Sequence, residues 1–310
     1  MSSSIDEFGE EYRRVMTDAG ALEGGLGLFW AVGEDSVGFL QGILSQEIVG
    51  LNPGESARSF LLEPRGKLNS LIWVLRGTDR VGIVTDGVLR DQVMRSLSRW
   101  MLRVKVELVP DPRPVFDVWG PGGGLPDIDS GWSDSDGLLV GELRRSPIRR
   151  RLVAGVTASE LEARGVFPIR SGTVDILRVE CGEPLMEVDV NEKTIPQETG
   201  LVPEAVSFSK GCYLGQELVA RIDTRGRVNR HLRGLRFIGK VKPPVGGSVN
   251  HEGKVVGTLT TVAESPSWGA QIALSLIRRE VEPGTLVTVS WEGDQAEAEV
   301  HELPMGMGTS

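Results

Sequence analysis

The chain has 310 residues, which is enough for two or three domains and a sizeable core. Its 34 basic and 43 acidic side chains give a net charge of −9, so the molecule as a whole repels nucleic acid and anionic membrane surfaces, and we expect neither as a partner. Forty glycines without a G-x-y period indicate many turns in a strand-rich fold and exclude collagen.

The first 150 residues predict alternating helices and strands. A capping box of Ser4 and Glu7 begins an amphipathic helix, and Gly20 ends it. Apolar periodicity then predicts, in chain order, a strand at 26–32, a helix after Asp35, strands at 59–63, 68–76 and 80–85, a helix at 88–101 and a strand at 103–109. Strand–helix–strand units of this kind indicate an α+β sheet layer with helices on one face. The glycine- and aspartate-rich sequence that follows predicts a junction between two lobes near 120–147.

The second half of the chain predicts two further kinds of structure. Thr157 and Glu160 begin a short helix, and a longer helix runs from Ser171 to Gly182. Residues 183–209 are irregular, and a connection of this length indicates function. Short β-rich runs then alternate with Gly/Pro turns, which predicts a small antiparallel barrel with strands at 232–238, 254–262, 272–277, 286–291 and 296–301. The expected domains are 1–231, an α+β region of two lobes, and 232–310, the barrel.

Cysteine, histidine and hydropathy patterns exclude further classes of protein. Cys181 and Cys212 cannot form a disulfide framework or a four-cysteine cluster site, and the three histidines have no metal-ligand spacing, so we predict no metal site. The acidic start of the chain lacks the apolar region of a signal peptide, and no apolar run approaches the roughly 20 residues that span a bilayer. These features predict a soluble, cytoplasmic protein without a membrane partner.

The segment from Ser209 to Ile222 carries the densest chemistry. Its second half has helical periodicity, which would place Cys212 just before a helix N-terminus and two residues from Lys210. The helix N-terminus and the Lys210 ammonium would each lower the pKa of the Cys212 thiol, from about 8.5 towards about 6–7.5. A thiol of that pKa is suited to act as a nucleophile, a redox sensor or a single soft metal ligand. The alternative is that Cys212 is a small buried apolar side chain.

Charged side chains mark two further candidates. Arginines gather in two stretches, one at Arg221, Arg225, Arg227, Arg230, Arg233 and Arg236 and one at Arg144, Arg145, Arg149, Arg150 and Arg151. On an acidic chain they suit a phosphate or a polyanionic ligand tail, and the alternative is a solvated, salt-bridged face. Glu180, near a helix end, either accepts two parallel N–H groups of a ligand or pairs with a nearby arginine.

The run from Lys210 to Glu217 (Lys-Gly-Cys-Tyr-x-Gly-Gln-Glu) resembles the signature of the YgfZ-like folate-binding proteins, which take part in assembly or repair of iron–sulfur clusters. Three other parts resemble the wider superfamily of the glycine cleavage T-protein (aminomethyltransferase): the R-x-E-x-G segment at 178–182, the turn at 195–198, and barrel segments at 256–261 and 273–277. The resemblance implies a three-lobed α+β arrangement around a central folate-binding channel, with a C-terminal antiparallel β-barrel.

The same resemblance implies roles for individual residues. Glu180 would hold the pterin ring, because a carboxylate accepts the exocyclic amine and ring N–H side by side, a charged hydrogen bond of about 1.5–3 kcal/mol. Lys210 would face the ligand beside the catalytic thiol of Cys212. On charge alone, Arg221, Arg225 and Arg227 would meet the folate glutamate tail. The cofactor is then tetrahydrofolate or a one-carbon derivative, and the partners are folate and iron–sulfur client enzymes or assembly factors.

One departure bears on the choice of function. Where T-proteins carry an acidic pair, this chain has Asn69 and Ser70, neither of which can hold a carboxylate's charge beside the reactive folate nitrogens. The favoured hypothesis is therefore a folate-binding accessory protein for iron–sulfur enzymes. The alternative is a tetrahydrofolate-dependent C1-transfer enzyme of the aminomethyltransferase type, and a third hypothesis is a nucleic-acid-binding module that uses the arginines.

Overall fold

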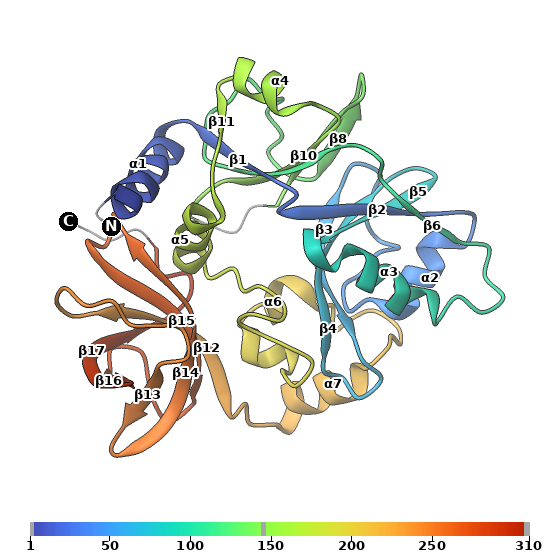
Figure 1. Cartoon of the computed structure of the whole chain (residues 1–310). Helices are drawn as coiled ribbons and strands as arrows, with labels where there is room; N and C mark the ends of the chain where they lie inside the picture. Colours follow the sequence, from blue (N-terminus) through green and yellow to red (C-terminus); the bar gives the residue numbers. More distant parts are fainter. Residues whose placement is uncertain (1–2, 144–146, 307–310) are drawn as a thin grey trace.

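The computed structural model describes residues 3–143 and 147–306; the side chains of residues 3–7 and of Arg225 lie outside the described set. Two open sheets and a closed barrel form three lobes, with helices α5 and α6 lying between them (Figure 1). The arrangement confirms the predicted α+β class and the C-terminal antiparallel barrel.

The first sheet has the strand order β3-β4-β5-β2-β6. Its strands are β2 (Leu26–Val32), β3 (Ser56–Leu62), β4 (Leu68–Arg76), β5 (Arg80–Asp86) and β6 (Glu107–Pro110). Helices α2 (Ser36–Ile43) and α3 (Arg90–Ser98), the latter preceded by η1 (Gly87–Leu89), share an apolar core with one face of this sheet. Because side chains alternate across a strand, the opposite face carries Leu28, Trp30 and Leu75 towards Leu139 and Leu152 of the second sheet.

The second sheet has the order β11-β1-β7-β10-β9-β8. Its strands are β1 (Ala19–Glu23), β7 (Val115–Trp119), β8 (Trp132–Ser135), β9 (Leu138–Glu142), β10 (Arg150–Ala154) and β11 (Val166–Pro168). Helix α4 (Ala158–Ala163) precedes β11 and has the predicted capping box: Glu160 N donates to Thr157 Oγ1 (3.3 Å), and Thr157 N donates to Glu160 Oε2 (2.7 Å).

The start of the chain differs from the prediction. Helix α1 (Ser3–Thr17) ends before Gly20, which lies inside β1, a strand that the sequence did not predict. Gly20 is needed for packing, because a Cβ at this position would lie 2.5 Å from Ile169 Cγ2. The predicted capping box of Ser4 and Glu7 involves side chains outside the described set.

The lobe junction also differs, because the region predicted near 120–147 contains the β8–β9 hairpin of the second sheet. The chain passes between the sheets twice instead, from β1 to β2 and from β6 to β7. The hairpin docks on the first sheet through Trp132, whose ring centroid is 5.5 Å from that of Trp30 and whose Nε1 donates to Arg76 O (3.0 Å).

The barrel closes in the order β12-β15-β14-β13-β16-β17. Its strands are β12 (Arg230–Phe237), β13 (Ser248–His251), β14 (Lys254–Ser265), β15 (Ala270–Arg278), β16 (Leu286–Trp291) and β17 (Asp294–His301). Strand β13 was not predicted, because Val249 is its only apolar residue among polar neighbours. Within the described residues, no helix combines the length and apolarity needed to cross a bilayer.

Four short elements connect the second sheet to the barrel: α5 (Ser171–Cys181), η2 (Pro196–Thr199), α6 (Val202–Ala205) and α7 (Gln216–Arg225). As predicted, α5 ends at Gly182, which has the left-handed φ of 67° that favours glycine. Buried Arg178 of α5 binds Asp189 Oδ2 through Nη1 (2.5 Å) and Thr261 Oγ1 of β14 through Nη2 (2.5 Å). This network fixes α5 and the following loop to the barrel.

We predict that Asp189→Asn lowers the free energy of unfolding by about 3 kcal/mol, because it removes the fully buried carboxylate bound to Arg178 and leaves that guanidinium only Asp175, 2.7 Å from its Nε. The matched control is Asp18→Asn, which removes the exposed partner of Arg14 at 4.0 Å and should cost at most about 1 kcal/mol. Urea unfolding of both variants measures the difference. Equal losses would show that Arg178 does not anchor the barrel.

Candidate functional site

Hydrogen bonds on both sides of Cys212 hold the signature segment (Lys210–Glu217) and the residues before it against the first lobe. Ser207 N donates to Ser45 O (3.0 Å), and Leu214 N donates to Gly42 O (3.1 Å). The segment therefore lies along the end of α2 and the chain that follows it.

Lys210 anchors this segment. Its ammonium donates to three main-chain carbonyls, those of Gln41 (2.7 Å), Leu44 (2.8 Å) and Gln46 (2.8 Å). Helix ends leave such carbonyls without intrahelical partners, and a cation is favoured there. Burial lowers the pKa of Lys210 to about 8. We expected Lys210 to face a ligand and to prime the thiol, but an ammonium has three donors and all three bind the end of α2.

A glycine pair brings the signature segment onto the β3–β4 turn. Gly66 and Gly215 both have a φ of 78°, in the left-handed region. A Cβ on Gly66 would lie 2.5 Å from Leu218 Cβ, and a Cβ on Gly215 would lie 2.6 Å from Glu63 O. The two turns approach so closely that neither tolerates a side chain, and together they fix the start of α7.

The two cysteines occupy opposite environments. Cys212 is exposed, so the alternative of a buried apolar side chain is wrong for it, whereas Cys181 is buried and its pKa is raised to about 12 mainly by that burial. Gly215 is the N-cap of α7, which leaves Cys212 three residues before the cap, farther from the helix N-terminus than predicted. The thiol is therefore distinguished by its accessibility on a rigidly held segment.

Glu180 lies at the junction of α1, α5 and the barrel. Its side chain is fully buried, and its carboxylate accepts hydrogen bonds from three hydroxyls: Tyr12 (2.8 Å), Ser265 (2.5 Å) and Ser267 (2.8 Å). Burial raises its pKa. The partners of Glu180 are thus hydroxyls, and the expected alternative of an arginine partner is wrong. The same carboxylate oxygens that we expected to accept a pterin edge already accept these three hydroxyls.

A buried network of charges lies where the sheets meet. Arg58 of β3 forms a two-pronged pair with Glu183, with Nη1 to Oε1 at 2.9 Å and a second contact from Nη2 to Oε2. Arg150 of β10 binds Asp117 of β7 in the same way (2.8 and 3.0 Å) and lies 3.6 Å from Glu183. The network links both sheets to the loop after α5.

Two small cavities adjoin this network, and Arg150, Glu183 and Pro184 line both. One, of about 90 Å³, also meets Trp119 and Arg178. The other, of about 20 Å³, is lined by Arg58, Asp86 and an apolar wall of Leu26, Leu71, Ile72, Trp73 and Val84. We refer to the two together as the central cavity.

Asp86, at the end of β5, is a residue of this cavity that the sequence analysis missed. Its Oδ2 accepts a hydrogen bond from Met186 N (3.3 Å), and burial raises its pKa to about 6 against the opposing effect of Arg150 and Arg178. The sequence did contain a signal for Asp86, because a carboxylate follows an otherwise apolar predicted strand at 80–85.

The residues that replace the expected acidic pair have local partners. Asn69 Nδ2 donates to Glu63 Oε1 (2.5 Å), and Ser70 Oγ lies 3.1 Å from Thr85 Oγ1. Thr85 directly precedes Asp86 in β5. A carboxyl group is thus present on the strand next to the one where the family pattern predicts it.

The arginine stretches do not form one surface. Arg230 binds Glu198 at 2.8 and 3.2 Å and Arg233 lies 3.4 Å from Glu302, as the salt-bridged alternative predicted. Arg221 and Arg227 are exposed, on and just after α7, and line neither part of the central cavity. The side chain of Arg225 and residues 144–146, which include Arg144 and Arg145, lie outside the described set.

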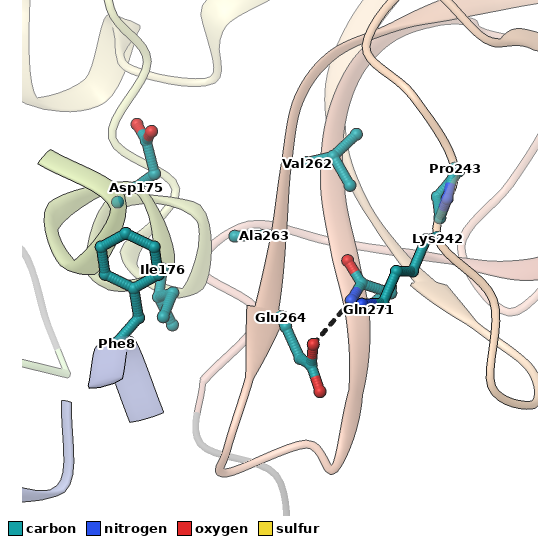
Figure 2. A pocket seen from close by; sticks show the side chains of 10 residues that line it. Phe8, Asp175, Ile176, Lys242, Pro243, Val262, Ala263, Glu264 and Gln271 are labelled. Carbon is teal, nitrogen blue, oxygen red and sulfur yellow. Dashed lines mark hydrogen bonds between the residues drawn. The ribbon is translucent and has the colours of Figure 1, made fainter. Parts of the chain in front are cut away.

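A larger hollow lies elsewhere, between α1, α5 and the barrel (Figure 2). Its volume of about 280 Å³ approaches the lower limit of ordinary ligand pockets. Apolar Phe8, Ile176 and Val262 line it, and Gln271 Nε2 donates to Glu264 Oε2 at 3.2 Å. None of the predicted site residues lies in this hollow.

Comparisons with known proteins agree with this architecture. Residues 230–305 match the model of the glycine cleavage T-protein C-terminal barrel domain. The aminomethyltransferase of Bacillus subtilis is 25% identical over 331 residues, which cover 95% of this chain and 90% of the relative. The tRNA-modifying protein YgfZ of Pectobacterium carotovorum is 29% identical over 217 residues, 65% of each chain. The crystal structure of the glycine cleavage system aminomethyltransferase T from Bartonella henselae superposes with a TM-score of 0.87 at 19% identity, covering 97% of this chain and 91% of that one.

The fold and the barrel thus define a relative of the glycine cleavage T-protein. The matches include YgfZ proteins as well as aminomethyltransferases, which supports the resemblance of the Lys210–Glu217 run to the YgfZ-like signature.

The different environments of the thiols give a direct prediction. An aromatic disulfide reagent should modify one thiol per native chain within minutes and both thiols in denaturant, because only the thiol of Cys212 is exposed. Cys212→Ser should abolish the fast reaction, and Cys181→Ser should preserve it. Rapid reaction of both thiols, or of neither, in the native chain would contradict the described environments.

The glycine contact gives a second prediction. Gly66→Ala should lower the free energy of unfolding by about 1–2 kcal/mol for the left-handed backbone and by about 1–3 kcal/mol more for the clash with Leu218. Gly24→Ala is the matched control, since Gly24 has a φ of 70° but nothing within 4 Å of an added Cβ. It should show the backbone cost alone in urea unfolding. Identical losses in the two variants would argue against the close contact of the turns.

Proposed function

We propose that this chain is a tetrahydrofolate-binding protein of the cytoplasm that uses the thiol of Cys212 to assist assembly or repair of iron–sulfur clusters in client enzymes. The observation that carries the proposal is the accessible thiol on a segment fixed by Lys210 and by the Gly66–Gly215 contact. A rigid, exposed thiol suits direct contact with a second protein. The similarity to YgfZ proteins and to aminomethyltransferases supports the folate-related part of the proposal.

The chemistry of the central cavity fits a pterin better than it fits an apolar ligand. A carboxylate in its lining can accept the amine and ring N–H groups on one pterin edge, and the apolar wall with Trp73 can pack against the ring. The cavity is smaller than the roughly 300–1,000 Å³ of ordinary ligand sites. Entry therefore requires Arg150 and Glu183 to move apart from their 3.6 Å contact while each keeps its own partner, Asp117 and Arg58. Bound tetrahydrofolate would supply a one-carbon carrier, and the residues of this chain would bind and orient it.

The roles within the proposal differ from those expected at first. Lys210 is a positioning residue, because its donors hold the end of α2. Arg221, Arg225 and Arg227 are left out of the pterin site, since the first and last line no part of the central cavity and the side chain of Arg225 is not described. One thiol cannot hold a cluster alone, so Cys212 would act together with ligands of the client.

The alternative function is tetrahydrofolate-dependent transfer of an aminomethyl carbon. Two observations favour keeping it: the match to aminomethyltransferases along nearly the whole chain, and a carboxyl group, that of Asp86, in the central cavity. It predicts turnover of a methylamine donor by the purified protein with tetrahydrofolate. The accessory function predicts tetrahydrofolate binding without such turnover.

The deciding experiment is complementation of cells that lack the native protein. The names of YgfZ relatives refer to tRNA modification, so an iron–sulfur enzyme that modifies tRNA is the client to assay. Cys212→Ser should bind tetrahydrofolate within about twofold of wild type in calorimetry but restore no client activity, because only the acting thiol is lost.

Cys181→Ser is the matched control, because it removes the buried thiol, and it should restore client activity fully. Full complementation by Cys212→Ser would remove the thiol from the mechanism. Turnover of a methylamine donor by either variant would favour the alternative function.

A further inference from the structure

Asp86 is the acidic group of the central cavity that has no arginine partner among the described residues, whereas the others are each paired with one. Glu183 is paired with Arg58, Asp117 is paired with Arg150, and Asp175 is paired with Arg178. Among the described residues, Asp86 has one hydrogen bond, from Met186 N at 3.3 Å, and no ion pair within 4.0 Å. One of its two oxygens is therefore available to a ligand.

The fold holds Asp86 in place without neutralising it. Asp86 is the last residue of β5 and pairs with Leu26 of β2, and both residues line the cavity. Thr85, one residue earlier, meets Ser70 of the neighbouring strand at 3.1 Å. The carboxyl group thus lies at the end of β5, where this strand pairs with β2, and next to an apolar wall.

We propose that Asp86 accepts a hydrogen bond from the donor edge of the pterin in the central cavity, in place of the carboxylate missing at Asn69 and Ser70. The inference rests on the proposed binding of tetrahydrofolate. It assigns the ligand-recognising carboxylate to β5, away from Glu180, whose oxygens already accept three hydroxyls.

The unbound protein should carry a signature of this arrangement. Burial raises the pKa of Asp86 from its ordinary 3.8 to about 6, so the folded chain holds this proton more tightly than the unfolded chain does. The contribution of Asp86 to stability is then greatest below about pH 4 and falls as the pH rises through 6. The groups that face it are Arg150, Arg178 and Asp117, and Glu183 and Arg58 share the cavity.

Asp86→Asn tests the inference, because the amide keeps the shape of the carboxyl group and removes its charge. Without ligand, the variant should melt at the wild-type temperature near pH 4 and above it at pH 8. With tetrahydrofolate, calorimetry at pH 8 should give about 10–150-fold weaker binding, the loss of one charged hydrogen bond. The ratio of wild-type to variant affinity should fall towards one below pH 6, because the carboxyl group of Asp86 is then protonated. Titration of the ligand itself affects both proteins equally and therefore does not change this ratio.

Glu180→Gln is the matched control and should bind tetrahydrofolate within about twofold of wild type. Unchanged affinity of Asp86→Asn at pH 8, with wild type binding, would overturn the inference while leaving the proposed function intact. If Glu180→Gln binds tetrahydrofolate weakly and Asp86→Asn does not, the inference is also overturned, and Glu180 is the carboxylate that binds the pterin. No binding by the wild type would overturn the folate part of the proposed function and this inference with it, whatever the outcome for Cys212.

Discussion

The buried charges between the lobes set the central geometry of this molecule. Arg58 and Arg150 come from different sheets and converge on Glu183 in the loop after α5, while Asp117 holds Arg150 from the other side. A buried charge without its partner costs several kcal/mol, so the sheets and the loop can dock only where all four groups are paired. Side chains held apart by such pairing leave the small polar cavity between the lobes, and Asp86 lies on its wall.

The structure separates two kinds of chemistry that the sequence placed together. The thiol of Cys212 lies on the outside, on a segment anchored by Lys210, whereas the acidic and basic groups that suit a pterin lie in the interior. Helix α6 and its neighbours contact both regions: Ser45 Oγ, beside the signature segment, donates to Ala205 O (2.6 Å), and Arg58 lies 3.4 Å from Glu204. An accessory protein of the proposed kind needs this division, since its cofactor would be enclosed and its thiol would have to reach a partner.

Sequence reasoning succeeded where a local signal has a local cause. The β4 strand, the α5 helix with its Gly182 end and the Thr157 capping box follow from periodicity and caps, and the barrel follows from short strands between turns. It failed where tertiary contacts decide: Gly20 is a packing glycine in a strand, Lys210 serves a helix end more than 160 residues away, and Glu180 meets hydroxyls from α1 and β14. Asp86 was missed because its environment is assembled from both sheets and the loop after α5.

Hydrogen exchange of the full chain with and without tetrahydrofolate tests the central claim most directly, because it reports where the ligand binds without altering a residue. We predict slower exchange in peptides that cover the end of β5, the facing part of β4 and the loop at 183–187, with no change around Tyr12 and Ser265. Protection confined to the contacts of Glu180, with β5 unchanged, would contradict the account.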